Sequence, residues 1–140
     1  MYCKKCFRIS PDGAPYCANC GASMAQPKES VGMLEATKLY FTRYDDIKGR
    51  SRRSEYWWAT LSIIIISGIV SIVLGSFAAI WSLVTLVPSL TLCVRRLHDI
   101  GKSGWWYLVS FIPLVGAIMM IVWFCQDSTA DNQWGPNPKY

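Results

Sequence analysis

The sequence predicts an all-α transmembrane helical domain with three spans, preceded by a small zinc ribbon folded as a β-hairpin. Residues 57–94 contain no Asp, Glu, Lys or Arg, and neither do residues 105–125. Uncharged apolar runs of about 18 residues or more are typical of membrane spans rather than of a soluble core. Close to the amino terminus, two Cys-x-x-Cys pairs have the spacing of a zinc site.

Charge is distributed unevenly along the 140 residues. The formal net charge is +5, and ten of the fourteen Lys and Arg residues precede Tyr56, next to the first apolar run. An excess of Lys and Arg beside membrane segments is typical of the cytoplasmic side. The amino terminus also lacks the apolar core of a cleavable signal peptide. We therefore expect the amino-terminal part of the chain to lie in the cytoplasm.

Residues 1–21 are expected to form the zinc ribbon. The pairs "CKKC" and "CANC" can each present two sulfurs to one tetrahedral Zn²⁺, at Zn–S distances of about 2.3 Å. The expected ligands are Cys3, Cys6, Cys17 and Cys20. Four thiolates leave no open position on the metal, so we expect one structural zinc rather than a catalytic one. The alternative, two disulfides, requires an oxidising compartment, which the basic flank argues against.

The ribbon is expected to dock a protein partner or to act as a regulatory head. Its basic residues, Lys4, Lys5 and Arg8, make a patch too small to indicate nucleic-acid binding. Nucleic acid is therefore not an expected partner.

Residues 22–32 are mostly small and polar and are expected to form a linker to a membrane domain at 33–140. The first element of this domain is a short helix that gathers Met33, Tyr40 and Tyr44 roughly on one side. Such a helix could lie on the membrane surface or pack on the membrane domain, and the sequence leaves both placements open.

The long apolar run is expected to cross the membrane twice. As one helix, residues 57–94 would extend about 57 Å, nearly twice a bilayer core of about 30 Å. Arginines precede and follow the run, so both of its ends favour the cytoplasmic side. A turn near Gly75 gives spans near 57–74 and 78–94. Ser67, Ser71 and Gly75 form a stripe of small residues that would let the second helix approach closely.

Residues 105–124 are expected to form the third span, which would place the carboxyl-terminal tail outside the cytoplasm. The tail contains one Lys and two Asp, so its charge does not favour the cytoplasmic side. The alternative is a re-entrant segment that turns at "PLVG" and leaves the tail in the cytoplasm.

A charged cluster is expected where the first span begins and the second ends. The turn between the spans brings Glu55 to the depth of Arg95 and Arg96, and Arg95 can pair with Asp99 one helical turn away. We call this cluster the charge collar; its expected members are Arg50, Arg53, Glu55, Arg95, Arg96, Asp99 and, through a hydrogen bond, His98. The alternative is that the arginines only set the topology and face lipid phosphates.

Four motifs resemble those of a known family. "GRSRRSEYWW", "RRLHDIGKSGWW", "PLVG" and "NQWGPNP" follow one another between residues 49 and 138. By these motifs, residues 34–140 resemble the small bacterial inner-membrane proteins of domain of unknown function family 805, also described as YhaH-like. The resemblance implies an integral protein of the bacterial cytoplasmic membrane and no agreed activity. The zinc ribbon is an addition that many members lack.

The expected function is that of a non-enzymatic, multi-pass inner-membrane protein with a cytoplasmic docking head. A transporter or channel is the alternative, although the sequence places no charge at mid-membrane, and three spans would need a homo-oligomer to enclose a path. A lipid-modifying enzyme would depend on His98 and Asp99 alone. These neighbours point to different faces of a helix and lack a nucleophile or metal beside them, so no catalytic residue is expected.

Overall fold

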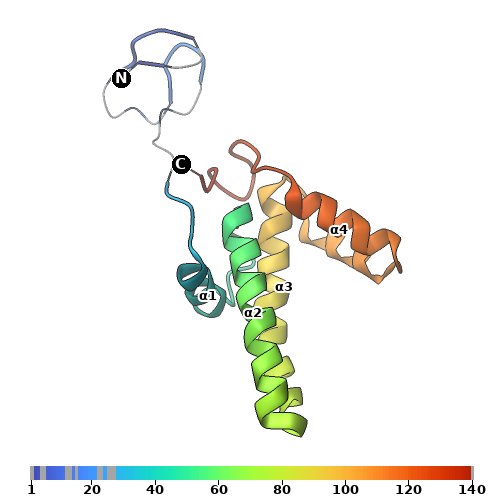
Figure 1. Ribbon diagram of the computed structural model, residues 1–140. Coiled ribbons are helices and arrows are strands. Elements are labelled where there is room, and N and C mark those ends of the chain that lie inside the picture. The colour runs from blue at the N-terminus through green and yellow to red at the C-terminus, as the bar shows by residue number, and fades with distance from the viewer. Residues whose placement is uncertain are drawn as a thin grey trace. The chain divides into compact units, whose positions relative to one another are not determined.

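The chain forms two compact units in a computed structural model, Met1–Glu29 with Lys139–Tyr140, and Ser30–Pro138. The structure describes residues 2–3, 6–11, 14, 16–21, 24 and 28–139, apart from the side chain at position 77. Its elements are, in order, α1 (Met33–Thr42), α2 (Arg53–Leu74), η1 (Gly75–Phe77), α3 (Ala78–Asp99), η2 (Gly104–Phe111) and α4 (Val115–Cys125), where η marks a 3-10 helix (Figure 1).

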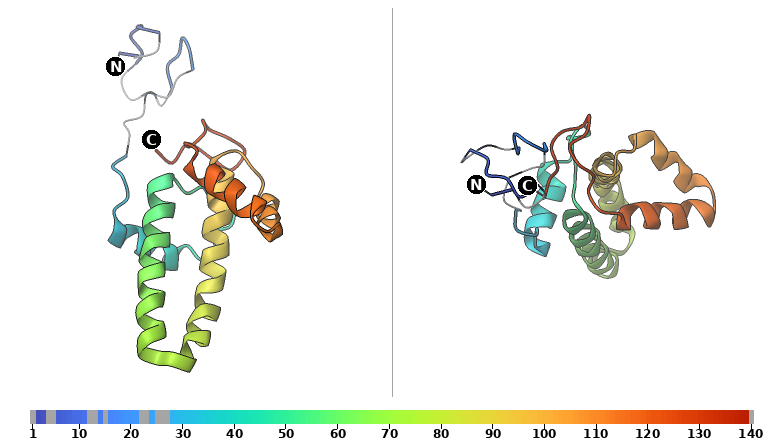
Figure 2. Two further views of the ribbon diagram at one scale, coloured as in Figure 1. Left: turned by 45° about the vertical axis from the view of Figure 1, so that its right-hand side comes forward. Right: turned by 90° about the horizontal axis from the view of Figure 1, so that it is seen from above.

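Helices α2 and α3 form an antiparallel hairpin closed by η1 (Figure 2). Each has 22 residues and is therefore about 33 Å long, close to the thickness of a bilayer core. Gly75 ends α2 with φ at 50°, a conformation that glycine adopts without steric cost. Among the described residues, α2 and α3 are the helices long and apolar enough to cross a membrane.

Of the expected stripe of small residues on α2, Ser67 contacts α3 through a polar group, whereas Ser71 and Gly75 are exposed. The indole Nε1 of Trp81 donates a hydrogen bond of 2.9 Å to Ser67 Oγ. Outward-facing positions on the same hairpin are apolar, as in Ile72 and Leu83, which are 86% and 71% exposed. This exposure is the reverse of a soluble fold and is what a lipid solvent requires.

Helix α1 packs against the hairpin, and this contact selects one of the two placements left open by the sequence. Its buried side is formed by Ala36 and Tyr40. The Tyr40 hydroxyl donates to the carbonyl oxygen of Thr85 at 2.9 Å and lies 2.7 Å from the hydroxyl of Ser89. The loop that follows α1 is held beside the end of α3, because the amide of Ser51 donates to the carbonyl oxygen of Arg95 at 3.2 Å.

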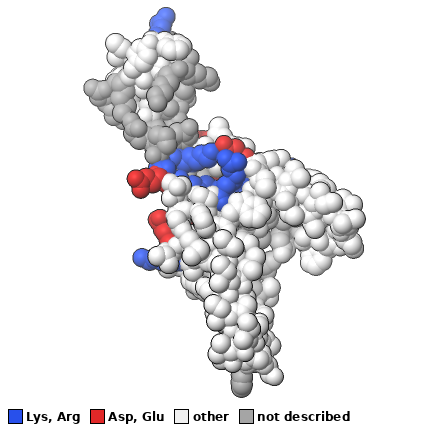
Figure 3. All heavy atoms as spheres, viewed as in Figure 1, with Lys and Arg blue, Asp and Glu red and all other residues white. Residues whose placement is uncertain are grey.

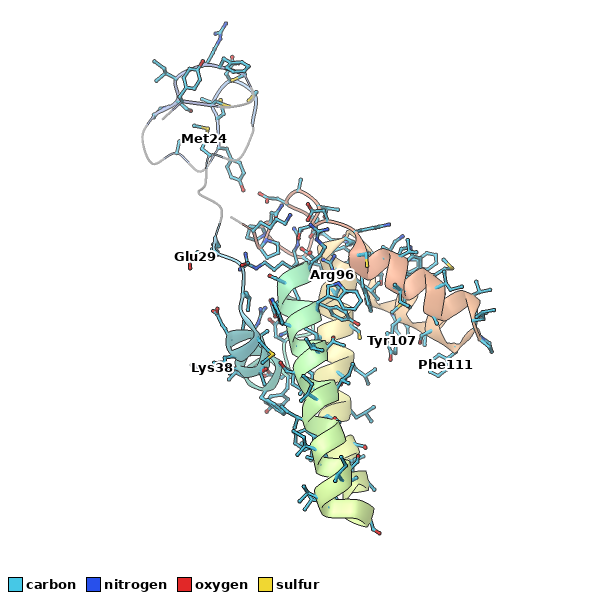
Figure 4. All side chains as sticks on the ribbon, viewed as in Figure 1. Met24, Glu29, Lys38, Arg96, Tyr107 and Phe111 are labelled. Atoms are coloured by element: carbon cyan, nitrogen blue, oxygen red, sulfur yellow. The ribbon has the colours of Figure 1, made fainter. Side chains whose placement is uncertain are left out.

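The third apolar segment differs from the single span expected at 105–124. It consists of η2, a turn, and α4, whose 11 residues extend about 16 Å, roughly half of a bilayer core. Pro113 disfavours helix at Ile112, which is extended with ψ at 112°, and Leu114 adopts a φ of 62°. The result is a second, shorter helical hairpin with Phe111 near its tip (Figure 4).

Gly116 allows the two arms of this shorter hairpin to meet. A Cβ atom at this position would lie 2.0 Å from the carbonyl oxygen of Val109, which is inside van der Waals contact. Farther along the arms, the rings of Trp106 and Trp123 pack edge to face with centroids 5.6 Å apart.

The carboxyl-terminal tail returns to the end of α3. The amide of Thr129 donates to the carbonyl oxygen of Asp99 at 3.0 Å, and Arg50 donates to the carbonyl oxygen of Gly135 at 2.9 Å. In this structure the tail therefore lies beside the start of α2 and the end of α3, an arrangement that fits the re-entrant alternative rather than a third span. The reason is the turn at "PLVG", which sends the chain back to the end it came from.

The amino-terminal unit contains no strand among its described residues, so the β-hairpin expected for the ribbon is not seen. Its backbone pairing includes an isolated antiparallel bridge between Tyr2 and Ile9. Part of the expected linker at 22–32 lies outside the described residues.

Candidate functional site

The four amino-terminal cysteines converge on one point. Their sulfur atoms all lie within 4.8 Å of one another. The Sγ atoms of Cys3 and Cys20 are 3.7 Å apart, and those of Cys6 and Cys17 are 3.6 Å apart. A tetrahedral zinc with Zn–S bonds of about 2.3 Å requires sulfurs about 3.8 Å apart. The cluster therefore fits a tetrahedral metal ion, and it is far too open for disulfide bonds of about 2.05 Å.

Backbone geometry explains how each Cys-x-x-Cys pair presents its sulfurs. The residue after each pair has a positive φ, 57° at Phe7 and 65° at Gly21. The amide of Phe7 donates to the carbonyl oxygen of Cys3, and the amide of Gly21 donates to that of Cys17. Both halves thus make the same tight turn, although only the second carries the glycine that such a turn favours.

The Cys17 sulfur is prepared to act as a thiolate. Hydrogen bonds from the backbone amides of Asn19 and Cys20 lower the pKa of Cys17 to about 6. Metals bind the thiolate form of cysteine, so a lowered pKa favours binding at neutral pH. The four residues could hold one metal ion.

The second candidate site is a buried charge network at the common end of α2 and α3, where Lys and Arg gather on a surface that is otherwise uncharged along the hairpin (Figure 3). Asp99 lies at its centre and is fully buried. Arg50 Nη2 is 3.1 Å from one carboxylate oxygen of Asp99, and Arg96 pairs with the other. The Ser128 hydroxyl donates to Asp99 as well, at 2.7 Å.

Arg50 connects this centre to the tail. Its Nη2 donates to the carbonyl oxygen of Thr129 at 2.8 Å, and its Nη1 donates to those of Ala130 and Gly135 at 3.0 and 2.9 Å. Arg96 donates to the carbonyl oxygens of Phe124 and Gln126. The arginines therefore supply hydrogen-bond donors to the backbone carbonyl groups of an irregular segment.

A second group forms around Glu55. Its carboxylate accepts a hydrogen bond of 2.9 Å from Ser51 and lies 3.6 Å from both Arg43 and Arg95. Arg95 is fully buried, and its Nη1 donates to the carbonyl oxygen of Arg43 at 2.8 Å. Asp99 thus pairs with Arg96, three residues earlier on the helix, and not with Arg95, the partner that the sequence predicts.

Arg43 and Asp46 belong to the network but were missed in the sequence. Arg43 Nε donates to Asp46 at 3.1 Å, and Asp46 accepts the amide of Gly49 at 2.9 Å. Although partial burial raises the pKa of Asp46, the hydrogen bonds from Arg43 and Gly49 outweigh it and hold that pKa below its usual range. The one available signal was the pair of opposite charges three residues apart in a loop.

Arg53 and His98, the remaining expected members of the charge collar, lie at the edge of the network. Arg53 is 46% exposed, and its Nη2 is 3.4 Å from Asp127. The ring of His98 stacks on that of Trp134, with centroids 4.4 Å apart and planes inclined by 8°. His98 therefore packs beneath the tail, and the carboxylate of Asp99 is held by donors other than the imidazole.

An antiparallel pair of long apolar helices, a shorter helical hairpin and a charged network at one end define a small helical membrane protein. The chain belongs to the family described as Protein of unknown function (DUF805), whose model matches residues 44–136. The matched residues include Arg50, Arg96 and Asp99 and exclude the four clustered cysteines.

Two relatives from Escherichia coli strain K12 are named as inner membrane proteins. The inner membrane protein YhaI is 36% identical over 105 residues, which cover 69% of this chain and 89% of YhaI. The inner membrane protein YhaH is 33% identical over 108 residues, which cover the same shares of the two chains. No solved structure matches.

Proposed function

We propose that this protein is a non-enzymatic, multi-pass protein of the bacterial inner membrane whose cytoplasmic zinc ribbon docks a protein partner. The four-sulfur cluster carries this proposal, because it gives a small unit outside the family match its own means of folding. A segment of about twenty residues cannot bury enough apolar surface to fold without such a ligand.

The metal of the ribbon is proposed to be one structural zinc ion, bound by all four thiolates. Such a site offers the metal no exchangeable position for a substrate. Zinc would then keep the ribbon folded, and the surface of the ribbon would be available for a partner.

The proposed topology has α2 and α3 crossing the membrane, with the ribbon, the charge network and the tail in the cytoplasm. Arginines flank the start of α2 and the end of α3, which favours the cytoplasmic side for both ends. The shorter hairpin of η2 and α4 would enter one leaflet and return, because neither arm is long enough to cross.

The polar groups of the network support a structural rather than a catalytic role. The Asp99 carboxylate accepts from Arg50, Arg96 and Ser128, and His98 is 7% exposed beneath Trp134. A general acid or base must reach a substrate within hydrogen-bond distance, and these groups face the protein instead.

The test is affinity purification of the full chain in detergent, compared with a variant in which Cys17 and Cys20 are replaced by Ser. We expect wild type to contain one zinc per chain and to retain protein partners. The variant should lose both and still insert in the membrane. Replacing Cys93 and Cys125 by Ser is the matched control, since it also removes two thiols. The proposal would be contradicted by an absence of stoichiometric zinc in protein purified without chelator, or by partners that remain bound to the variant. Solute flux in liposomes would favour the alternative, a small oligomeric transporter.

A further inference from the structure

A groove opens beside the first turns of α2, on the outside of the charge network. It has a volume of about 370 Å³ and is lined by Arg53, Ser54, Trp57, Trp58 and Cys125. Arg50, Arg95 and Arg96 of the network are buried, whereas the side chain of Arg53 is 46% exposed. Arg53 therefore supplies a positive charge that a molecule outside the protein can reach.

The Arg53 guanidinium is only loosely held by its neighbours. Its Nη1 donates to the carbonyl oxygen of Cys125 at 3.3 Å, and its Nη2 lies 3.4 Å from Asp127, whose side chain is 58% exposed. A guanidinium has five N–H donors, and an exposed ion pair of this kind contributes at most about 1 kcal/mol. An anion can therefore share or replace these contacts.

Two further donors point to an anion. The Ser54 hydroxyl lines the groove and is buried without a hydrogen-bond partner in the described part of the chain. Ordinary helical serines in this structure, such as Ser62 and Ser71, donate to the carbonyl four residues earlier. The groove also adjoins the start of α2, where the first amides have no intrahelical acceptor and no side chain caps the helix.

The remaining walls indicate that the anion is attached to a lipid. Trp57 and Trp58 are 41% and 42% exposed and lie one helical turn beyond Arg53 on a helix whose later surface is apolar. Tryptophan is enriched at the level of lipid headgroups. A guanidinium followed by indoles along one helix matches the order of phosphate and then glycerol and acyl chain in a phospholipid.

We propose that this groove binds the phosphate of an anionic phospholipid of the inner leaflet, with Arg53 and Ser54 as donors and the two indoles against the lipid backbone. The site depends on the proposed membrane placement of α2 and is separate from the ribbon. Each arginine near a membrane surface contributes about 1 kcal/mol to binding of anionic lipid, which corresponds to about fivefold in affinity.

The test is native mass spectrometry of the full chain in detergent, titrated with phosphatidylglycerol or with phosphatidylcholine of the same acyl chains. We expect phosphatidylglycerol to bind more tightly, and Arg53→Gln to weaken it about fivefold. Arg53→Lys should retain most of the binding, while Ser54→Ala should weaken it without any change of charge. The matched control is Lys38→Gln, which removes an exposed positive charge from α1 and should change nothing.

Several outcomes would overturn the site. Both lipids carry a phosphate, so equal binding of the two would exclude a groove that selects an anionic headgroup. Equal binding by wild type and Arg53→Gln would exclude Arg53 as the donor to the phosphate. Equal loss in Lys38→Gln would mean that general surface charge attracts the lipid. Displacement of phosphatidylglycerol by millimolar inorganic phosphate would assign the groove to a soluble anion. Thermal melting and membrane fractionation of each variant, run in parallel, separate loss of the site from loss of folding or of membrane insertion.

Discussion

Asp99 is the residue on which the buried network depends most. It is fully buried, and two arginines that are themselves almost completely buried share its carboxylate. Asp99→Asn leaves both of these cations without a counter-charge, so we expect a loss of about 3–5 kcal/mol in stability. Thermal melting of the wild type and of the variant in detergent measures this loss of stability.

The matched control for this change is Asp127→Asn, which removes a carboxylate that is 58% exposed. It should cost less than about 1 kcal/mol. Glu55→Gln should lie between the two, because Glu55 is buried but 3.6 Å from its arginines. If Asp99→Asn melts like wild type, the network does not hold the fold together.

Asp46 makes part of the stability dependent on pH. Its pKa is lower in the folded protein than in the unfolded chain, because hydrogen bonds from Arg43 and Gly49 overcome partial burial. The stabilisation is therefore complete above the unfolded pKa of about 3.9 and is lost as the pH falls through the lower folded value. We expect Asp46→Asn to melt earlier than wild type at pH 7, and the difference to shrink below about pH 4. A constant difference across this range would contradict the prediction.

The choice of partner within the network shows why residue-level predictions from sequence are limited. Positions three and four residues apart are both neighbours on a helix, so Asp99 could pair with Arg96 or with Arg95. Which arginine faces Asp99 depends on how α3 is rotated against the tail, and that rotation follows from packing along the whole segment. The backbone carbonyls that bind Arg50 carry no sequence signature at all, because every residue has one.

Among the elements, the shorter hairpin depends on a single position. Gly116→Ala would place a Cβ atom 2.0 Å from the backbone oxygen of Val109, and backbone cannot move aside as a flexible side chain can. We expect η2 and α4 to separate, with a lower melting temperature and faster proteolysis at residues 104–125. Gly68→Ala is the control, since nothing lies within 4 Å of its Cβ position in α2. Alanine there should be neutral or slightly stabilising.

The two hairpins differ in how readily the sequence indicates them. The turn between α2 and α3 follows from length and charge, because residues 57–94 are too long to cross once and have arginines at both ends. The break in the third segment depends on local geometry. Pro113 favours an extended Ile112, but membrane helices often tolerate proline. The sequence also does not predict the positive φ of Leu114.

The ribbon shows a different limit. Its cysteine spacing specifies which four sulfurs meet, since each pair must follow a tight turn. The spacing does not specify how the intervening backbone pairs, and the described residues contain isolated bridges rather than strands. Phe7 adopts the positive φ that Gly21 adopts in the other half, so the turn of the Cys-x-x-Cys pair forms even where the residue type disfavours it.

In the whole helical unit, the tail connects the start of α2 to the end of α3. It hydrogen-bonds to Arg50, which precedes α2, and to Asp99, which ends α3. In the proposed topology, α2 and α3 are antiparallel spans joined at η1. Their other two ends would then share one side of the membrane, and the tail would share it with them. The basic flanks favour the cytoplasm for that side. A third crossing would move the tail across the bilayer and remove the acceptors that now satisfy buried guanidinium groups, at a cost of several kcal/mol.

We therefore expect a fluorescent reporter that matures only in the cytoplasm to be active when fused after residue 140. A phosphatase that is active only outside the cytoplasm should be inactive at the same position. The control fusions, made after Ser76 in η1, should show the opposite pattern, because that turn joins two helices of about 33 Å at their far ends. The tail contacts can be tested separately with Gly135→Trp, which changes the residue whose carbonyl oxygen accepts from Arg50. If the phosphatase is active after residue 140, and if this variant also melts like wild type, the third segment crosses the membrane. The contacts between Arg50 and the tail would then not exist in the bilayer.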